Sequence, residues 1–228
     1  MKKLVVLSGA GMSAESGIST FRDQDGLWEN HDVMEVASPQ GWSNNQELVL
    51  RFYNQRRQQL KEVRPNQGHL NLVQLEKYYD TNIVTQNVDD LHERAGSSQI
   101  YHLHGELRKV RSTVDRSLIY DWTEDLNIGD RCEKGSQLRP HIVWFGESVP
   151  MIETALNLVL EAEIIVIIGT SMQVYPAAGL VGYARSDAQI YYIDPKPKIN
   201  YELSQFNNLE IIEKGAGKGT QDLLDKLL

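Results

Sequence analysis

The sequence predicts an α/β fold: a Rossmann-like parallel sheet with helices on both faces, plus a smaller second lobe built from insertions. The first observation is a set of apolar runs that are short, rich in β-branched residues and followed by turn or polar residues. Such runs are typical of buried parallel strands. They are Leu4–Leu7, Ile83–Thr85, Ile164–Ile168 and Ile190–Ile193.

The second observation is that segments with helical spacing of apolar residues lie between and after these runs. Their apolar positions are Leu70 and Val73, then Ile152, Leu156, Val159 and Leu160, and finally Leu223, Leu224, Leu227 and Leu228. Strands that alternate with helices indicate a doubly wound sheet, in which ligands bind at the carboxyl ends of the strands.

Two stretches do not fit such a sheet. Asp25–Leu60 has no strand signal and is predicted as a loop followed by a helix over Gln46–Leu60, whereas Glu106–Pro140 is mixed, polar and irregular. We therefore expect one domain over residues 1–228 with two lobes. The Rossmann-like lobe covers about 1–24, 62–105 and 141–228, and the small lobe covers about 25–61 and 106–140.

The composition excludes several classes of protein. One cysteine among 228 residues forms no intramolecular disulfide, so a disulfide-framed secreted scaffold is excluded and a cytoplasmic location is expected. The longest apolar run, Ile164–Ile168, is far shorter than a membrane helix, and no signal-peptide pattern follows Met1. A net charge of −8 argues against nucleic acid as a partner. The oligomeric state is open, with a monomer favoured.

A glycine turn, Gly9-Ala10-Gly11, follows the first predicted strand. Glycines let the backbone approach a pyrophosphate, and the next helix is expected to point free N–H groups at the anion. Ala14 stands where the dinucleotide fingerprint has its third small residue. The acidic residue expected about 20 positions later has no clear counterpart, so an ordinary dehydrogenase fits badly. The alternative is a tight turn of purely structural value.

Longer blocks are more specific and arrive in order along the chain. They are Gly9–Ile18, Thr20–Arg22, Gly26–Trp28, Thr85–His92, His102–Leu107, Val143–Glu147 and Gly169–Ser171. The sequence resembles the sirtuin family of NAD-dependent protein deacylases, and the resemblance spans Leu4 to Leu228. It implies that NAD is a consumed cosubstrate rather than a hydride carrier, and that acylated-lysine proteins are the partners.

The resemblance implies an extended set of cofactor-binding residues. They are Gly9, Ala10, Gly11, Ala14, Glu15, Thr20, Phe21, Arg22, Trp28, Gln86, Asn87, Val88, Asp89, His104, Gly169, Thr170, Ser171, Asp194, Pro195, Lys196 and Ala216. Arg22 could neutralise diphosphate or bind a ribose, and the alternative is a surface arginine. Phe21 could shield the nicotinamide side from water, and the alternative is a core position. At Asp194 many family members have asparagine, which weakens one expected ribose contact.

His104 is the strongest candidate for catalysis, because histidine titrates near neutral pH and can act as a general base. His102 and His104 share a face if they lie on a strand, but no third metal ligand is evident from spacing. His104 directly precedes Gly105, so the resemblance implies that His104 is the family's base. We expect His102 to pack or to make a hydrogen bond.

Gln86, Asn87 and Asp89 lie at the end of a predicted strand, where amides and a carboxylate can bind a ribose and a carboxamide. The alternative for each residue alone is a turn or capping role. The resemblance implies that Asn87 and Asp89 support nicotinamide release.

Tyr53 and Arg56 are the candidates for acyl recognition. Their i, i+3 spacing places them on one helix face, where an arginine fork and a tyrosine hydroxyl can bind a carboxylate. The alternative is a solvated face, since Arg51 and Arg57 are near. Phe52–Arg57 resembles the segment of sirtuins that accept succinyl-, malonyl- or glutaryl-lysine, which implies an acidic-acyl pocket.

The peptide is expected to add as a strand beside one loop. By resemblance its residues are Val143, Trp144, Phe145, Gly146 and Glu147, and the alternative for Trp144 is an ordinary core position.

Most sirtuins hold a structural zinc with four cysteines, but this chain has only Cys132, and Ser112-Thr113 stands where the first cysteine is expected. We therefore expect no zinc. The small lobe is expected to be held by packing through Leu118, Ile119, Trp122, Leu126 and Ile128.

The sequence thus predicts an NAD-dependent protein-lysine deacylase that removes acetyl and succinyl or malonyl groups and releases nicotinamide and O-acyl-ADP-ribose. Two alternatives stay open. One is an NAD glycohydrolase or ADP-ribosyltransferase, which would release nicotinamide without an acyl-peptide. The other is a non-catalytic sensor of NAD or ADP-ribose, which would bind without turnover.

Overall fold

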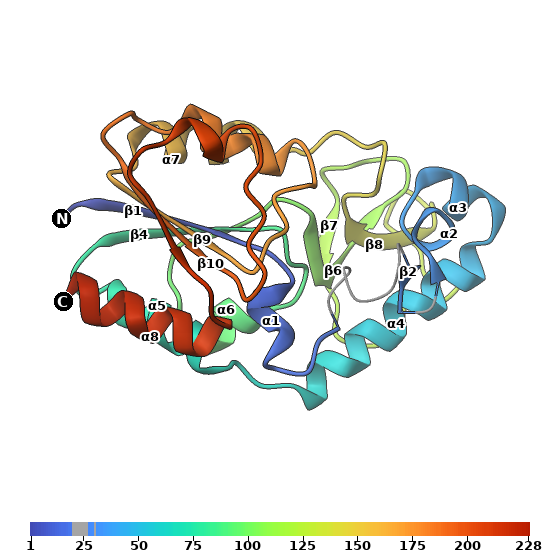
Figure 1. The fold of residues 1–228 in the computed structure, drawn as a ribbon. Helices are drawn as coiled ribbons and strands as arrows, with labels where there is room; N and C mark the ends of the chain where they lie inside the picture. Colours follow the sequence, from blue (N-terminus) through green and yellow to red (C-terminus); the bar gives the residue numbers. More distant parts are fainter. Residues whose placement is uncertain (20–26, 30) are drawn as a thin grey trace.

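A six-stranded, fully parallel sheet forms the centre of the larger lobe in the computed structural model, which describes residues 1–19, 27–29 and 31–228 (Figure 1). The strand order is β11 (Leu209–Ile212), β10 (Gln189–Ile193), β9 (Ile164–Ile168), β1 (Lys3–Ser8), β4 (Asp80–Thr85) and β5 (Ile100–His102). The four predicted strands are confirmed as the central β10, β9, β1 and β4. Both edge strands are missed, because they are short and only partly buried.

Helices cover both faces of this sheet, which confirms the doubly wound class. One face carries α5 (Gln67–Leu75), α6 (Leu91–Ala95) and α8 (Ala216–Leu227), and the other carries α7 (Ile152–Glu161) and the 3-10 helix η2 (Ala177–Tyr183) (Figure 1). β1 shows how the sequence serves both layers. Leu4 and Val6 pack toward α5 and α8, whereas Val5 and Leu7 pack toward α7 and η2, as period-two alternation requires.

We call the edge of the sheet at which its parallel strands end the rim. The short helix α1 (Gly11–Ala14) follows β1 there. The carboxyl ends of β1, β4 and β9 lie side by side at this rim, because Ser8 pairs in register with Thr85 on one side and with Ile168 on the other. A further 3-10 turn, η3 (Leu203–Gln205), lies between β10 and β11.

The smaller lobe is built around a three-stranded antiparallel sheet and one long helix. The sheet order is β7 (Ile119–Asp121), β6 (Gly105–Ser112) and β8 (Leu138–Ile142), and a hairpin of β2 (Leu27–Trp28) and β3 (His31–Asp32) lies apart from it. The helices are α2 (Val33–Val36), α3 (Pro39–Asn44) and α4 (Gln46–Glu62), as Figure 1 shows. The predicted helix over Gln46–Leu60 is confirmed as α4. The residue limits of the two lobes stay a prediction.

Two expectations for this lobe are corrected. The hairpin β2–β3 lies where no strand was expected, because two-residue strands leave no periodic signal in the sequence. β6 lies in the stretch predicted to be irregular. The strand has no apolar alternation there because Arg111 occupies a buried position and pairs with the Glu147 carboxylate.

The core of the smaller lobe contains part of the set predicted to hold it. Leu126 is fully buried beside Cys132 and Leu50, with Leu118 and Trp122 packed at the edge of the cluster. Ile119 and Ile128 are 43% and 53% exposed, so the prediction that they pack is wrong for both. Among the described residues, no helix is both long and apolar enough to cross a bilayer.

Candidate active site

The glycine turn after β1 packs against the chain that leaves β9. Gly9 N–H donates to Ile168 O at 3.0 Å, and Gly11 N–H donates to Gly169 O at 2.8 Å. A Cβ on Gly11 would lie 2.6 Å from Gly169 Cα, so a side chain here would push the two segments apart. Gly169 itself has φ +59°. Glycines at positions 9 and 11 are therefore required for the close packing of these two segments.

The helix after this turn differs from the expectation of free N–H groups. α1 has only four residues, and the N–H groups of Gly11, Met12 and Ser13 donate to the carbonyls of Gly169, Gly9 and Ala10. These three groups are therefore not free for an anion. Ala14 ends the helix and is exposed.

Ser13 connects two site residues that the sequence analysis names separately. Its hydroxyl donates to Asp89 Oδ2 at 2.8 Å and accepts from Asn87 Nδ2 at 3.1 Å. All three side chains are at least nine-tenths buried. No role is predicted for Ser13 from the sequence, although Ser13 lies inside the Gly9–Ile18 block. It joins the end of β1 to the end of β4.

Asp89 also caps a turn with its side chain, which is the alternative role given for it in the sequence analysis. Its Oδ1 accepts from Leu91 N–H at 3.1 Å at the start of α6. Burial raises the pKa of Asp89, although the hydrogen bonds from Ser13 and Leu91 act in the opposite direction. The carboxyl group is held in place from both sides.

His104 has a defined tautomer. Its Nδ1 lies 3.0 Å from Gln86 O, and because a carbonyl can only accept, Nδ1 carries the proton and Nε2 keeps its lone pair. Burial lowers the pKa of His104, so the ring is neutral at neutral pH. The Gln86 side chain donates in turn to Thr170 Oγ1 at 3.1 Å. A neutral imidazole with a basic Nε2 at the strand ends can accept a proton.

Gly105 explains why a glycine follows this histidine. It has φ +84°, and a Cβ here would lie 2.0 Å from His141 O. The carbonyl of His104 also accepts from Val143 N–H at 2.9 Å. The histidine therefore lies where β6 begins and where the loop after β8 begins.

His102 makes the hydrogen bonds expected of it. Nδ1 donates to Asn87 O at 2.9 Å, and Nε2 lies 2.7 Å from Glu93 Oε1. Burial alone would lower the pKa of His102, but the bond to Glu93 and its charge raise it overall. His102 thus supports the main chain of Asn87.

A second part of the rim lies at the ends of β9 and β10. Thr170 is buried next to the half-buried Ser171, and the hydroxyl of the buried Tyr192 donates to Thr170 O at 2.8 Å. Sequence reasoning missed Tyr192, which reads as an ordinary strand residue. Asp194 Oδ1 accepts from Lys196 N–H at 2.8 Å. Pro195 and Lys196, which are predicted to bind the cofactor, are both exposed.

Glu15 and Ala216, two predicted cofactor residues from opposite ends of the chain, lie close together. Ala216 begins α8, and Glu15 Oε1 accepts from Gly217 N–H in the first turn of that helix at 3.2 Å. A carboxylate is stabilised at a helix N-terminus. The predictions for Thr20, Phe21 and Arg22 fall outside the described residues.

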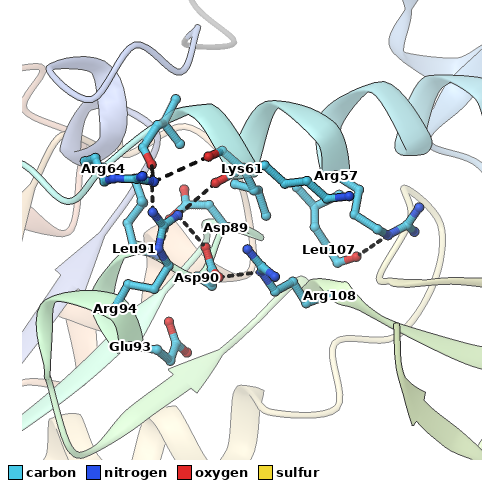
Figure 2. A network of polar contacts seen from close by, with 12 residues as sticks. Arg57, Lys61, Arg64, Asp89, Asp90, Leu91, Glu93, Arg94, Leu107 and Arg108 are labelled. Carbon is cyan, nitrogen blue, oxygen red and sulfur yellow. Dashed lines mark hydrogen bonds and ion pairs between the residues drawn. The ribbon is translucent and has the colours of Figure 1, made fainter. Parts of the chain in front are cut away.

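A polar network joins the two lobes beside this rim (Figure 2). Arg94 in α6 donates to Leu60 O at 2.9 Å and to Val63 O at 2.7 Å, where α4 ends. Asp90 pairs with Arg94 and with Arg108 of β6. The turn after β4 is therefore held to α4 and to the smaller sheet. Val88, half-buried in the same turn, accepts from Leu107 N–H at 2.8 Å.

Tyr53 lies in an aromatic cluster of the smaller lobe. It is fully buried, Phe52 and Trp28 pack edge-on against it, and its hydroxyl accepts from Trp144 Nε1 at 3.0 Å. Burial raises the pKa of Tyr53, so the phenol is neutral. Trp28, predicted to bind cofactor, thus lies against the predicted acyl-binding residue Tyr53.

Arg56 lies beside the same aromatic cluster. Its guanidinium stacks over the Phe52 ring at 5.1 Å, and NH1 lies 3.9 Å from Glu29 Oε2. Among the described residues, neither Nε nor NH1 has a hydrogen-bond partner, although both atoms are buried. Arg57 is buried and donates to Leu107 O at 2.9 Å, so only Arg51 has the solvated position of the alternative reading.

The predicted peptide-binding loop is a turn whose residues divide into two groups. Phe145 and Gly146 are exposed and Val143 is half-buried, whereas Trp144 and the carboxylate of Glu147 face the interior. Backbone N–H groups of this loop largely donate within the protein: Val143 to His104 O, Trp144 to Glu147 Oε2, Phe145 to Ala37 O and Glu147 to Trp144 O. Strand addition by a peptide would therefore have to use other backbone groups.

The residues around Cys132 do not fit a zinc site. Its thiol lies 3.3 Å from Ser112 Oγ and 3.2 Å from Ser136 Oγ, and the nearby Asp115 pairs with Lys134. One thiol and two hydroxyls are a poor donor set for zinc, which binds cysteine, histidine and carboxylate. Within residues 1–19, 27–29 and 31–228, no group of three or more such side chains could hold a metal ion.

The fold defines a Rossmann-like protein with a cluster of buried polar side chains at the strand ends, where such folds bind ligands, and a second lobe packed beside it. The chain belongs to the Sir2 family, whose profile matches residues 9–176. A Helicobacter pylori protein named NAD-dependent protein deacylase is 62% identical over 228 residues, covering 100% of this chain and 98% of the relative. A Bacteroides thetaiotaomicron protein of the same name is 52% identical, covering 100% and 99%. A crystal structure titled as a Sir2 homologue–NAD complex superposes with a TM-score of 0.87 at 38% identity, covering 98% of this chain and 88% of that one.

Proposed function

We propose that this chain is an NAD-dependent protein-lysine deacylase that removes acetyl and succinyl or malonyl groups and releases nicotinamide and O-acyl-ADP-ribose. The observation that carries the proposal is the pairing of His104 with Gln86. It leaves a basic Nε2 at the rim where Asn87, Ser13 and Asp89 gather. The names of the relatives support the same activity for a chain this similar.

The proposed reaction begins when the acyl oxygen of the lysine attacks the ribose carbon from which nicotinamide departs. Asn87 and Asp89 stabilise the departing group and the cationic ribose, because both are buried polar groups held in position by Ser13. Nε2 of His104 then accepts a proton from a ribose hydroxyl, and that oxygen attacks the acyl carbon. Water completes the release of lysine and O-acyl-ADP-ribose.

NAD is held by the rim in this proposal. Gly9, Ala10 and Gly11 let its diphosphate approach the end of β1, and Gly169–Ser171 borders it from β9. Asp194, Pro195 and Lys196 lie on the adenosine side, together with Ala216 and Glu15. Arg22 completes the set as a partner for the diphosphate.

Selectivity for an acidic acyl group rests on Arg56. Two buried nitrogens of Arg56 have no hydrogen-bond partner among the described residues. A hydrogen-bond acceptor beside them would remove the free-energy cost of leaving buried donors unpaired. A carboxylate supplies that acceptor in bidentate form. Glu29, whose carboxylate lies 3.9 Å from NH1, supports the idea that an acid can be accommodated there. Tyr53, beside the same ring of Phe52, keeps its own hydroxyl hydrogen for a further acceptor because it accepts from Trp144.

Mass spectrometry of acetyl- and succinyl-lysine peptides with NAD tests the proposal. We expect both peptides to lose their acyl group and nicotinamide to appear in equal amount. Release of nicotinamide without any peptide would favour an NAD glycohydrolase instead. Binding of NAD with no turnover of either peptide would favour a sensor.

We further propose that the protein acts in the cytoplasm and without zinc. The single cysteine supports the location, and the hydrogen-bonded Ser112, Cys132 and Ser136 support the absence of a metal. Elemental analysis of purified protein should find well under one zinc per chain. A value close to one would contradict this proposal.

A further inference from the structure

Glu147 lies in the loop that resemblance assigns to the peptide, yet its carboxylate is turned into the protein and is 8% exposed. Oε1 accepts from Arg139 NH1 at 2.8 Å and from Arg111 NH2 at 3.0 Å, and Oε2 accepts from Trp144 N–H at 2.9 Å. Charge-assisted bonds of this kind are the strong ones in proteins. Glu147 therefore binds its own loop to two strands of the smaller sheet rather than a peptide.

Arg139 holds the same loop in two further ways. Its NH2 donates to Ile142 O at 2.9 Å, just before the loop, and its guanidinium lies over the Trp144 ring at 3.3 Å. Burial lowers the pKa of Arg139 to about 10, so it stays charged at neutral pH, and a cation over an indole face is attracted to it. Arg139 thus fixes both the backbone at Ile142 and the plane of the Trp144 ring.

Trp144 is hydrogen-bonded to Tyr53, the predicted acyl-binding residue. The indole Nε1–H donates to the Tyr53 hydroxyl at 3.0 Å, and both side chains are almost completely buried. An indole nitrogen can only donate, so the Tyr53 oxygen is the acceptor and its hydrogen is directed elsewhere. The orientation of the Tyr53 hydroxyl therefore depends on where the indole lies.

We propose that Arg139 and Glu147 are positioning residues for the acyl group. They hold Trp144, and through its indole N–H they set the hydroxyl of Tyr53, without touching the substrate themselves. This inference rests on the proposed function, because Tyr53 is assigned to acyl recognition there. It adds that peptide binding and acyl recognition depend on one buried arginine–glutamate–tryptophan–tyrosine chain of contacts.

Arg111 provides a matched control within the same cluster. It binds both oxygens of Glu147 from β6, at 3.0 and 3.2 Å, as Arg139 does from β8. The two arginines differ in that Arg139 lies over the Trp144 ring, whereas Arg111 lies over no aromatic ring among the described residues. Replacing either arginine removes one positive charge and leaves the carboxylate one arginine partner. Only the Arg139 variant removes the contact with the Trp144 ring.

The experiment compares Arg139→Met with Arg111→Met by steady-state kinetics and thermal unfolding. At saturating NAD, we expect Arg139→Met to raise KM for the acyl-peptide about tenfold, the scale expected when a group in one binding site is misplaced. KM for NAD should stay within about twofold, since Arg139 itself contacts Glu147, Ile142 O and the Trp144 ring rather than the residues assigned to NAD. Arg111→Met should change the peptide KM much less at a similar cost in Tm. Equal peptide KM values for the two variants, or an equal rise in KM for NAD, would overturn the inference.

A second measurement does not need turnover. The indole N–H resonance that Trp144→Phe removes identifies Trp144 in the NMR spectrum, and we expect Arg139→Met to shift it while Arg111→Met leaves it nearly in place. An unshifted Trp144 resonance in folded Arg139→Met protein would overturn the inference. If the wild-type protein turns over no acyl-peptide, the proposed function fails, and this spectrum still decides whether Arg139 positions Trp144.

Discussion

The Nδ1 atom of His104 lies 3.0 Å from the carbonyl oxygen of Gln86, so the tautomer of the proposed base is set by a backbone acceptor. The same glutamine reaches Thr170 with its side chain, which connects the end of β4 to the chain that leaves β9. Several elements of the larger lobe therefore meet at one imidazole.

The pH dependence of turnover follows from this geometry. Burial lowers the pKa of His104 below its ordinary value of 6.5, so the basic form is fully present at neutral pH and is lost only as pH falls through the lowered pKa. We expect kcat/KM to fall on the acid side with an apparent pKa below 6.5. A rate profile whose acid limb has its midpoint above pH 7 would contradict this role. His104→Ala should lose at least about a hundredfold in kcat.

Ser13 should matter for both stability and turnover. Ser13→Ala leaves the Asn87 amide and the Asp89 carboxylate without a shared buried partner, which costs roughly 1–3 kcal/mol of unfolding free energy. We expect a lower kcat in addition, because Asn87 then loses its hydrogen bond to Ser13 and Asp89 keeps only the one from Leu91 N–H. Denaturant unfolding and steady-state kinetics measure the two effects. Ser204→Ala, at an exposed position, is the control, and the expectation fails if the two variants behave alike.

Arg56 and Glu29 should change acyl preference in opposite directions. Arg56→Met removes the proposed carboxylate partner, and we expect kcat/KM for succinyl-lysine to fall about tenfold or more while that for acetyl-lysine changes little. Glu29→Gln removes a competing carboxylate from the guanidinium and should favour succinyl-lysine relative to acetyl-lysine. Competition assays with both peptides in one tube report the ratio directly. A ratio that both variants leave unchanged would argue against an acidic-acyl pocket.

Acid should destabilise the larger lobe through two buried histidines. His69 and His92 lie ring to ring at 4.8 Å, and burial lowers the pKa of His69 to about 4 and that of His92 well below 6.5. The unfolded chain binds these protons near pH 6.5 and the folded chain does not. The contribution of these two histidines to stability is therefore fully present above pH 6.5 and falls toward pH 4, by up to about 1.4 kcal/mol per pH unit for each histidine.

His92→Gln tests this through the difference between two unfolding curves. The variant has lower stability at pH 7.5, since it loses the contact between His92 and Ser8, but its stability should fall less steeply between pH 6.5 and 4. Asp89 titrates in both proteins, so its contribution cancels in the comparison. Parallel curves over that interval would show that His92 is not responsible.

The sequence was sufficient for the central strands and for α4, because buried parallel strands and a long helix leave strong periodic patterns. The sequence was insufficient where buried strand residues are charged and form ion pairs with residues elsewhere in the chain. Arg111 and Arg139 lie on strands of the smaller sheet and are buried only because Glu147 neutralises them, so no local pattern marks those strands. The same ion pairs hold the Glu147 carboxylate in the interior, which no spacing in the sequence indicates.

The candidate site divides in a similar way. Family resemblance pointed to His104, Asn87 and Asp89, and the fold brings them to one rim. Ser13 and Tyr192 were missed because a serine in a glycine-rich turn and a tyrosine in a buried strand have no distinctive spacing. Their importance comes from hydrogen bonds to residues that are far away in the chain.

The most direct test of the account is to incubate the purified protein with NAD and one equivalent of succinyl- or acetyl-lysine peptide and to count products by mass spectrometry. The account predicts one nicotinamide and one O-acyl-ADP-ribose for each lysine released, with product formed at least about a hundredfold more slowly by His104→Ala protein. Nicotinamide released without loss of the acyl group, or full turnover by His104→Ala, would contradict it.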